Sequence, residues 1–98
     1  MKISIIIPTI NEENNLSDVL ILLLSNPYKD MELIVVDGGS SDKTQQIANS
    51  FDGVKLVVSE IKSRAIQMNL GAEHAIGDVL YFVHADSRPP ESFPNDIA

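Results

Sequence analysis

Four short runs of apolar residues, separated by segments with helical periodicity, constrain the fold of this chain more than any other feature. The runs are rich in valine and isoleucine and cover residues 3–7, 32–36, 54–58 and 79–83. They lack the alternation of apolar and polar residues that a sheet with one solvated face requires. They therefore predict strands that are buried on both faces.

The three intervening segments have the periodicity of amphipathic helices, and we expect helices near residues 12–25, 42–51 and 63–76. Their expected buried faces are, in turn, Leu16, Val19, Leu20 and Leu23; Thr44, Ile47, Ala48 and Phe51; and Ala65, Met68, Ala72 and Ala75. Asn11 is the expected N-cap of the first helix, and Ser40 or Ser41 that of the second. Gly77 is expected to cap the end of the third.

Alternating strands and helices imply right-handed crossovers and a parallel sheet covered by helices on both faces. The sequence thus predicts an α/β, Rossmann-like, three-layer domain with a sheet of about four strands, truncated after the fourth. We expect the strand order third, second, first, fourth. The length of 98 residues allows one domain, residues 1–98.

Charge and composition exclude several classes of function. The formal net charge is −7, and the seven Lys and Arg residues are scattered, which argues against nucleic-acid partners and anionic membrane surfaces. The absence of cysteine removes disulfides, zinc–thiolate sites and thiol nucleophiles, and it fits a reducing compartment. The longest apolar run, residues 19–24, is too short for a transmembrane segment. We therefore expect a cytoplasmic protein.

Polar residues follow three of the four predicted strands. The first run leads into residues 8–12, the second into 37–42 and the fourth into 84–86. In parallel sheets the carboxyl ends of the strands share one edge, where ligands bind. Asp37 could merely stabilise a turn, and His84 could be a structural histidine, but one ligand would explain all three groups together.

Three motifs carry a resemblance to a known family. The sequence IIIPTINEE at residues 5–13 resembles the opening strand of glycosyltransferase family 2, and LIVVDGGSSDKT at 33–44 is similar to that family's second strand and turn. The sequences NLGA at 69–72 and GDVLYF at 77–82 resemble the segment before its Asp-x-Asp motif. The resemblance spans residues 3–86.

The resemblance implies a GT-A fold that binds a nucleoside-diphosphate sugar of the UDP, TDP or GDP type, with Mg²⁺ or Mn²⁺ on the diphosphate, for inverting glycosyl transfer to an unknown acceptor. The substrate-binding residues that it implies are Pro8, Thr9, Asn11, Glu12, Asp37, Arg64, Asn69, His84, Ala85 and Asp86. In it, Asp37 accepts a hydrogen bond from a base, which favours the ring N–H of uracil, thymine or guanine. Asp86 is the metal ligand.

The sequence departs from the family pattern at four positions. His84 replaces the first Asp of Asp-x-Asp, Ile10 a frequent tyrosine, Gly38 a common second Asp, and Met68 a frequent arginine. These departures bear on metal binding and on the identity of the base.

The resemblance also places the acceptor pocket and a carboxylate base after Asp86, and the chain has no counterpart of them. We therefore assign no catalytic residue and expect the C-terminal half of the domain to be absent and the fragment to be inactive. A non-catalytic remnant, or a self-associating nucleotide-binding module, is the alternative. The unpaired edge of the fourth strand predicts a homo-oligomer.

Two other classes fit less well. A sugar nucleotidyltransferase needs a glycine-rich, basic loop after the first strand, where this chain has PTINEE at residues 8–13. A receiver-like regulatory domain needs an aspartate at the end of the third strand, where this chain has Val58, Ser59 and Glu60.

Overall fold

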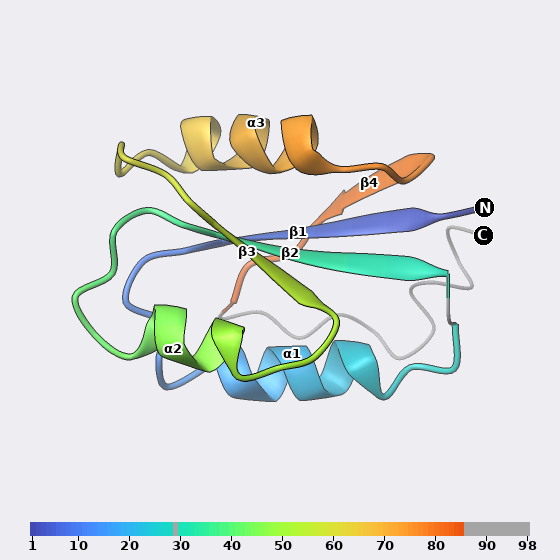
Figure 1. The fold of residues 1–98 in the computed structure, drawn as a ribbon, viewed down its shortest axis with the longest axis horizontal. Coiled ribbons are helices and arrows are strands. Elements are labelled where there is room, and N and C mark those ends of the chain that lie inside the picture. The colour runs from blue at the N-terminus through green and yellow to red at the C-terminus, as the bar shows by residue number, and fades with distance from the viewer. Residues whose placement is uncertain (29, 86–98) are drawn as a thin grey trace.

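The computed structural model describes residues 1–28 and 30–85. In chain order its elements are β1 (Ile3–Thr9), α1 (Leu16–Leu24), β2 (Met31–Asp37), α2 (Thr44–Asn49), β3 (Val54–Val58), α3 (Arg64–His74) and β4 (Val79–Phe82). The strands form one parallel sheet in the order β3-β2-β1-β4 (Figure 1). The predicted α/β class, strand order and parallel pairing are confirmed.

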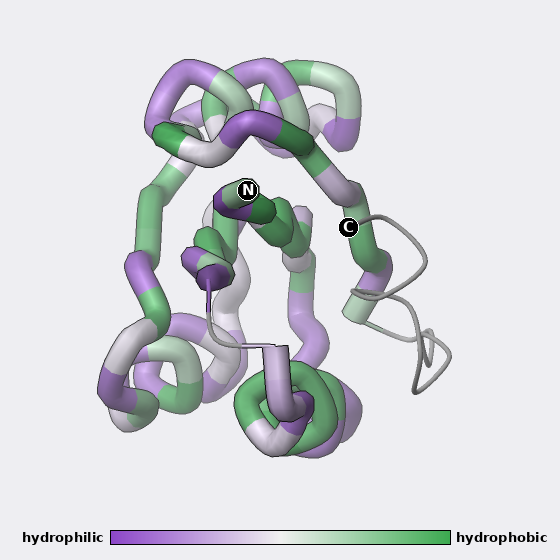
Figure 2. Tube along the Cα trace, turned by 90° about the vertical axis from the view of Figure 1, so that its right-hand side faces the viewer, coloured by the Kyte–Doolittle hydropathy of each residue, from purple (hydrophilic) through white to green (hydrophobic). Residues whose placement is uncertain are grey.

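The helices make two further layers, with α3 on one face of the sheet and α1 and α2 on the other (Figure 1). Successive side chains of a strand point to opposite faces, so the central strands must be apolar on both. On β1, Ile5 and Ile7 belong to the core that contains Leu20 of α1, whereas Ile6 packs toward Leu70 of α3. Figure 2 shows hydrophobic residues on the strands of the sheet and on α1.

The outer strands are less buried than predicted. Residues of β3 and β4 are half-buried or exposed, whereas all of β1 is buried. On β4, the side chains of Leu80 and Phe82 keep 41% and 38% exposure. The prediction of burial on both faces was wrong for these two strands, because each pairs with only one neighbouring strand among the residues that the structure describes.

The expected buried faces of the first two helices are confirmed, but both helices begin later than predicted. Asn11 does not cap α1, which starts at Leu16. Asn11 has φ 51°, and its side-chain oxygen accepts a 2.9 Å hydrogen bond from the backbone N–H of Ser41 in the next loop. Its amide joins two loops and is therefore not free to cap a helix.

The other two capping predictions were also wrong. α2 follows Lys43, and the carboxylate of Asp42, rather than Ser40 or Ser41, accepts the backbone N–H of Thr44 at 2.9 Å. α3 ends at His74, and the backbone N–H of Gly77 donates to the hydroxyl of Ser4 at 2.8 Å. Gly77 thus joins the start of β4 to β1.

The buried face of α3 coincides only in part with the predicted alanine stripe. Ala72 and Ala75 pack against the core around Ile6, but Ala65 is exposed, and the fully buried residues of the helix are Gln67 and Gly71. A Cβ atom at Gly71 would lie 2.5 Å from Cγ2 of Ile6 and 3.0 Å from Cγ2 of Val36. The helix approaches the sheet through a glycine that a hydrophobic pattern does not detect.

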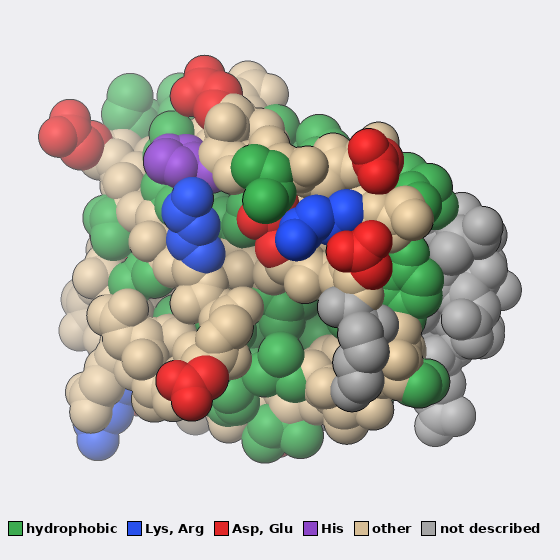
Figure 3. All heavy atoms as spheres, turned by 45° about the vertical axis from the view of Figure 1, so that its right-hand side comes forward, with side chains coloured by type: hydrophobic (Ala, Val, Ile, Leu, Met, Phe, Trp, Pro, Cys, Tyr) green, Lys and Arg blue, Asp and Glu red, His purple; other side chains and the backbone are tan. Residues whose placement is uncertain are grey.

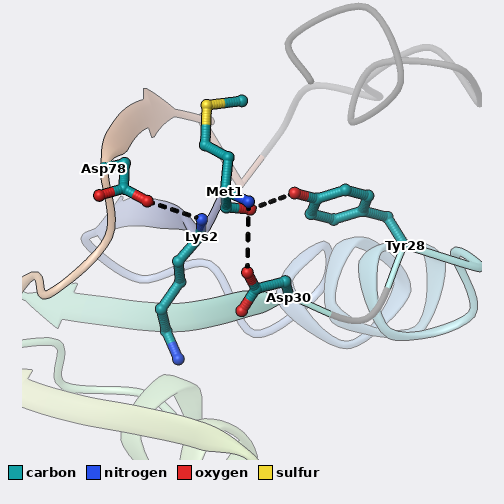
Figure 4. A network of polar contacts seen from close by, with 5 residues as sticks. All are labelled: Met1, Lys2, Tyr28, Asp30 and Asp78. Atoms are coloured by element: carbon teal, nitrogen blue, oxygen red, sulfur yellow. Dashed lines mark hydrogen bonds and ion pairs between the residues drawn. The ribbon is translucent and has the colours of Figure 1, made fainter.

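A polar network fixes the amino end of β1, at the opposite end of the strand from Thr9 (Figure 4). The backbone N–H of Lys2 donates to the carboxylate of Asp78 at 3.0 Å, and the hydroxyl of Tyr28 donates to the carbonyl of Met1. The amino group of Met1 lies 3.7 Å from Asp30. These contacts tie β1 to the segments that precede β2 and β4.

Basic side chains on the face shown in Figure 3 are scattered among acidic ones and form no continuous patch there. Within residues 1–28 and 30–85, every helix is too short or too polar to cross a bilayer.

Candidate functional site

The carboxyl ends of β1 and β2 are joined by two side chains that the sequence placed in the site. Thr9 and Asp37 are register partners, and the Thr9 hydroxyl donates to Oδ1 of Asp37 at 2.8 Å. Both residues are buried, with 1% and 0% exposure. The two strands therefore end in a buried hydrogen bond at the edge of the sheet where ligands bind in folds of this class.

The carboxylate of Asp37 accepts five hydrogen bonds. Oδ1 accepts from the hydroxyls of Thr9 and Ser40, and Oδ2 accepts from the backbone N–H groups of Gly39 and Ser40 and from Nε2 of Gln45. Burial by itself raises the pKa of Asp37, but the hydrogen bonds from Ser40, Gln45 and Thr9 outweigh burial and hold that pKa below its usual range.

A carboxylate has about four lone-pair positions, and donors within the chain occupy those of Asp37. The residue was expected to accept a hydrogen bond from a base. The structure instead gives Asp37 a set of partners that organises the turn after β2, and in this arrangement it has no lone pair left for a ligand.

Hydrogen bonds connect the loop after β1 to the loop after β2. The backbone N–H of Asn11 donates to the hydroxyl of Ser40 at 2.8 Å, and that of Glu12 donates to the hydroxyl of Thr44 at 2.8 Å. Asn11 is exposed and Glu12 is half-buried. Two of the three predicted polar segments are thus brought into direct contact.

A pocket lies between the end of β1 and the start of α3. It is lined by Pro8, Thr9, Ile10, Lys62, Arg64 and Gln67. Pro8, Thr9 and Arg64 were expected in the site. Asn69 was expected there too, but it is exposed and does not line this pocket, because it lies about 200° around the helix from Gln67.

Arg64 also reaches the segment after β4. Its Nη1 lies 2.7 Å from Nδ1 of His84. A guanidinium can only donate, so Nδ1 accepts and the ring proton of the neutral imidazole sits on Nε2. His84 therefore offers an N–H donor rather than a lone pair at its second nitrogen.

The remaining predicted residues are placed as follows. Ala85 is buried in the core on the α1 face, with 2% exposure, and contributes packing there. Asp86, the predicted metal ligand, lies outside the described residues. Within the described part of the chain, no group of three His, Asp or Glu residues is placed to hold a metal ion.

The family of the chain follows from comparison with known proteins. The model of the family described as "Glycosyl transferase family 2" matches residues 4–96, which include all three motifs. The chain belongs to glycosyltransferase family 2. The fold of this family 2 chain is the GT-A type that the sequence predicted.

Three similar proteins illustrate the relationship. An uncharacterized glycosyltransferase of Haemophilus influenzae is 36% identical over 89 residues, which cover 86% of this chain and 36% of that protein. The structure of S. aureus TarS 1-349 in complex with UDP-GlcNAc matches with TM-score 0.89 and 27% identity, over 99% of this chain and 30% of that one. The mannosyltransferase PcManGT of Pyrobaculum calidifontis, in complex with GDP-Man and Mn²⁺, matches with TM-score 0.82 and 25% identity, over 93% and 29%. The chain spans about one third of the length of each relative.

Three residues of this pocket, Ile10, Lys62 and Gln67, were not among the site residues expected from the sequence. Lys62 precedes α3 and belongs to no motif. Gln67 could have been found from its spacing, because residues 64, 67 and 71 share one face of a helix. A polar residue in line with Arg64 marks this face of the helix, and an apolar pattern does not detect it.

Proposed function

We propose that this chain is the donor-binding part of a glycosyltransferase whose donor is a nucleoside-diphosphate sugar. The observation that carries the proposal is the pocket at the carboxyl end of β1, where two cationic side chains, Lys62 and Arg64, lie beside the buried Thr9. In a chain of net charge −7, a pocket with this lining favours an anionic ligand. The solved relatives hold UDP-GlcNAc and GDP-Man, which supports this ligand class.

The lining divides by chemistry into two parts. Pro8, Thr9 and Ile10 offer apolar atoms and backbone groups suited to a nucleoside. Arg64 and Lys62 offer charged donors, and His84 adds the N–H at Nε2, so these three side chains would hold the diphosphate. Asn11 and Glu12 remain proposed contacts of the nucleoside.

We include a divalent cation, Mg²⁺ or Mn²⁺, in the proposal for two reasons. Asp86 is the metal ligand that the family resemblance implies, and the solved mannosyltransferase is in complex with Mn²⁺. When bound, such an ion would neutralise charge on the departing diphosphate. The described residues do not fit a cation site, since Nδ1 of His84 faces the guanidinium of Arg64. We therefore assign diphosphate binding to Arg64, Lys62 and His84 and derive no step through the metal.

The reaction that we propose for the whole protein is inverting transfer. The oxygen of an acceptor hydroxyl attacks the anomeric carbon, the bond from that carbon to the diphosphate oxygen breaks, and a carboxylate base takes the hydroxyl proton. Among the described residues that line the pocket, none carries a carboxylate. We therefore expect the 98-residue chain by itself to bind donor without transferring sugar, which keeps a nucleotide-binding module as the second candidate.

Titration calorimetry tests the proposal directly. UDP, TDP, GDP and uridine are titrated into the protein with and without Mn²⁺. We expect at least one diphosphate to bind, and to bind more tightly than its nucleoside, because Arg64 and Lys62 contact the diphosphate. If none of the three diphosphates binds at millimolar concentration with metal present, the proposed function is wrong.

A further inference from the structure

The amide of Gln67 is held in one orientation by two backbone carbonyls. Its Nε2 donates to the carbonyl of Thr9 at 3.0 Å and to that of Val36 at 2.9 Å, and the side chain is 2% exposed. Carbonyl oxygens only accept, so the nitrogen and not the oxygen of the amide must face them, and both of its protons are used. Gln67 thereby ties α3 to the ends of β1 and β2.

The oxygen of the same amide is an acceptor that no donor among residues 1–28 and 30–85 reaches. Oε1 lies beside the position that a Cβ atom of Gly38 would occupy, and Gln67 lines the pocket together with Pro8 and Ile10. A nearly buried acceptor at a pocket wall is a group that a ligand can satisfy.

Gly38 leaves the room that this oxygen occupies. A Cβ atom at position 38 would lie 2.9 Å from Oε1 of Gln67 and 2.4 Å from Cδ1 of Ile10. A side chain at position 38 and the observed placement of Gln67 and Ile10 exclude each other. The glycine and the glutamine therefore act together to present an uncharged acceptor at this point.

We propose that Oε1 of Gln67 accepts the ring N–H of the nucleotide base, so that Gln67 selects a base with an imide-type N–H, as in uracil, thymine or guanine. This inference rests on the proposed function and names the residue that reads the base. It replaces the base contact expected of Asp37, whose carboxylate is filled by five donors of its own chain.

The test compares UDP with its N3-methyl derivative, which lacks the ring N–H. A comparison with CDP or ADP would be less direct, because the exocyclic amines of cytosine and adenine also donate. Calorimetry on the full-length protein should show that the wild type prefers UDP over 3-methyl-UDP by about tenfold or more. Gln67→Met keeps the length of the side chain and removes the acceptor, so the preference should fall to near onefold. Gln46→Met, at an exposed position of α2, is the matched control and should keep it.

Comparing the two ligands in the wild type and in Gln67→Met separates recognition of the ring N–H from steric exclusion of the N3-methyl group. If the pocket rejects the N3-methyl group only because of its size, the preference persists in Gln67→Met, and the inference is overturned while the proposed function stands. If the wild type binds none of the nucleoside diphosphates, the proposed function fails first.

Gly38→Ala provides a second variant that keeps the Gln67 side chain itself, in case Gln67→Met does not fold. Its methyl group would displace Oε1, so the preference for UDP over 3-methyl-UDP should weaken several-fold. An undiminished preference in a folded Gly38→Ala protein would also overturn the inference.

Discussion

Thr9 and Asp37 stand opposite each other in the register of β1 and β2, and the hydroxyl of Thr9 donates to Asp37 across 2.8 Å. The bond is buried, and Asp37 also holds the turn that carries Ser40. The pair therefore links the stability of the central strands to the geometry of the loops around the pocket.

Asp37→Asn should lower the free energy of unfolding by roughly 1–3 kcal/mol at pH 7, because the amide of Asn brings protons toward groups that already donate. The pKa of Asp37 in the folded protein is below its usual value, so its stabilising contribution is complete above the unfolded pKa of about 3.9 and is lost as the pH falls through the folded pKa. The difference between wild type and variant should hence be constant from about pH 5 upward and shrink below about pH 4. Urea unfolding at several pH values measures it.

The control for this prediction is Asp52→Asn, at an exposed position, which should change stability by less than about 0.5 kcal/mol. A difference between Asp37→Asn and wild type that stays the same down to pH 2 would contradict the charge argument.

Arg64→Gln should weaken the binding of UDP about tenfold and leave uridine nearly unaffected, because the guanidinium is assigned to the diphosphate. Titration calorimetry with both ligands, at low and high salt, separates the two effects. Lys55→Gln changes the charge equally at an exposed position of β3 and should leave both affinities unchanged. An equal loss for UDP and uridine would assign Arg64 to the nucleoside instead.

Gly71→Ala should destabilise the fold by roughly 1–2 kcal/mol, because the overpacking against Ile6 and Val36 exceeds the gain in helix propensity. Chemical denaturation measures the change. Glu73→Ala, at an exposed position of the same helix, should be near neutral. A Gly71→Ala variant as stable as wild type would mean that α3 can move away from the sheet without cost.

The 98-residue chain should self-associate through the face around β4, where Leu80 and Phe82 are exposed. Light scattering over a concentration series should show dimers or larger species, and Leu80→Lys should shift them toward monomer. Ile21→Lys removes an exposed apolar side chain of α1 and serves as the control. A wild-type chain that stays monomeric at high concentration contradicts the prediction.

The arrangement of strands could be predicted because it depends on patterns that are local in sequence. The apolar runs at residues 3–7 and 32–36 mark central strands, and the faces that contain Leu20 and Ala48 mark the helices beneath them. Edge strands could not be told from central strands in this way, since Val54 and Leu80 lie in runs as apolar as those of β1. How far a strand is covered depends on its neighbours in space.

The sequence by itself determined the family, the parallel sheet and the edge at which the polar segments gather, because motifs and periodicities are properties of neighbouring residues. Only the tertiary structure decided how the acceptors at that edge are used. Asp37 is a carboxylate in a family motif, yet donors from three segments saturate it. Gln67, which no motif marks, lines the pocket and has an oxygen that no donor among the described residues reaches. Four of the five donor groups around Asp37 lie within eight residues of it, and the fifth, the hydroxyl of Thr9, comes from 28 positions away. The two bonds that orient Gln67 span 31 and 58 positions, and no local pattern encodes them.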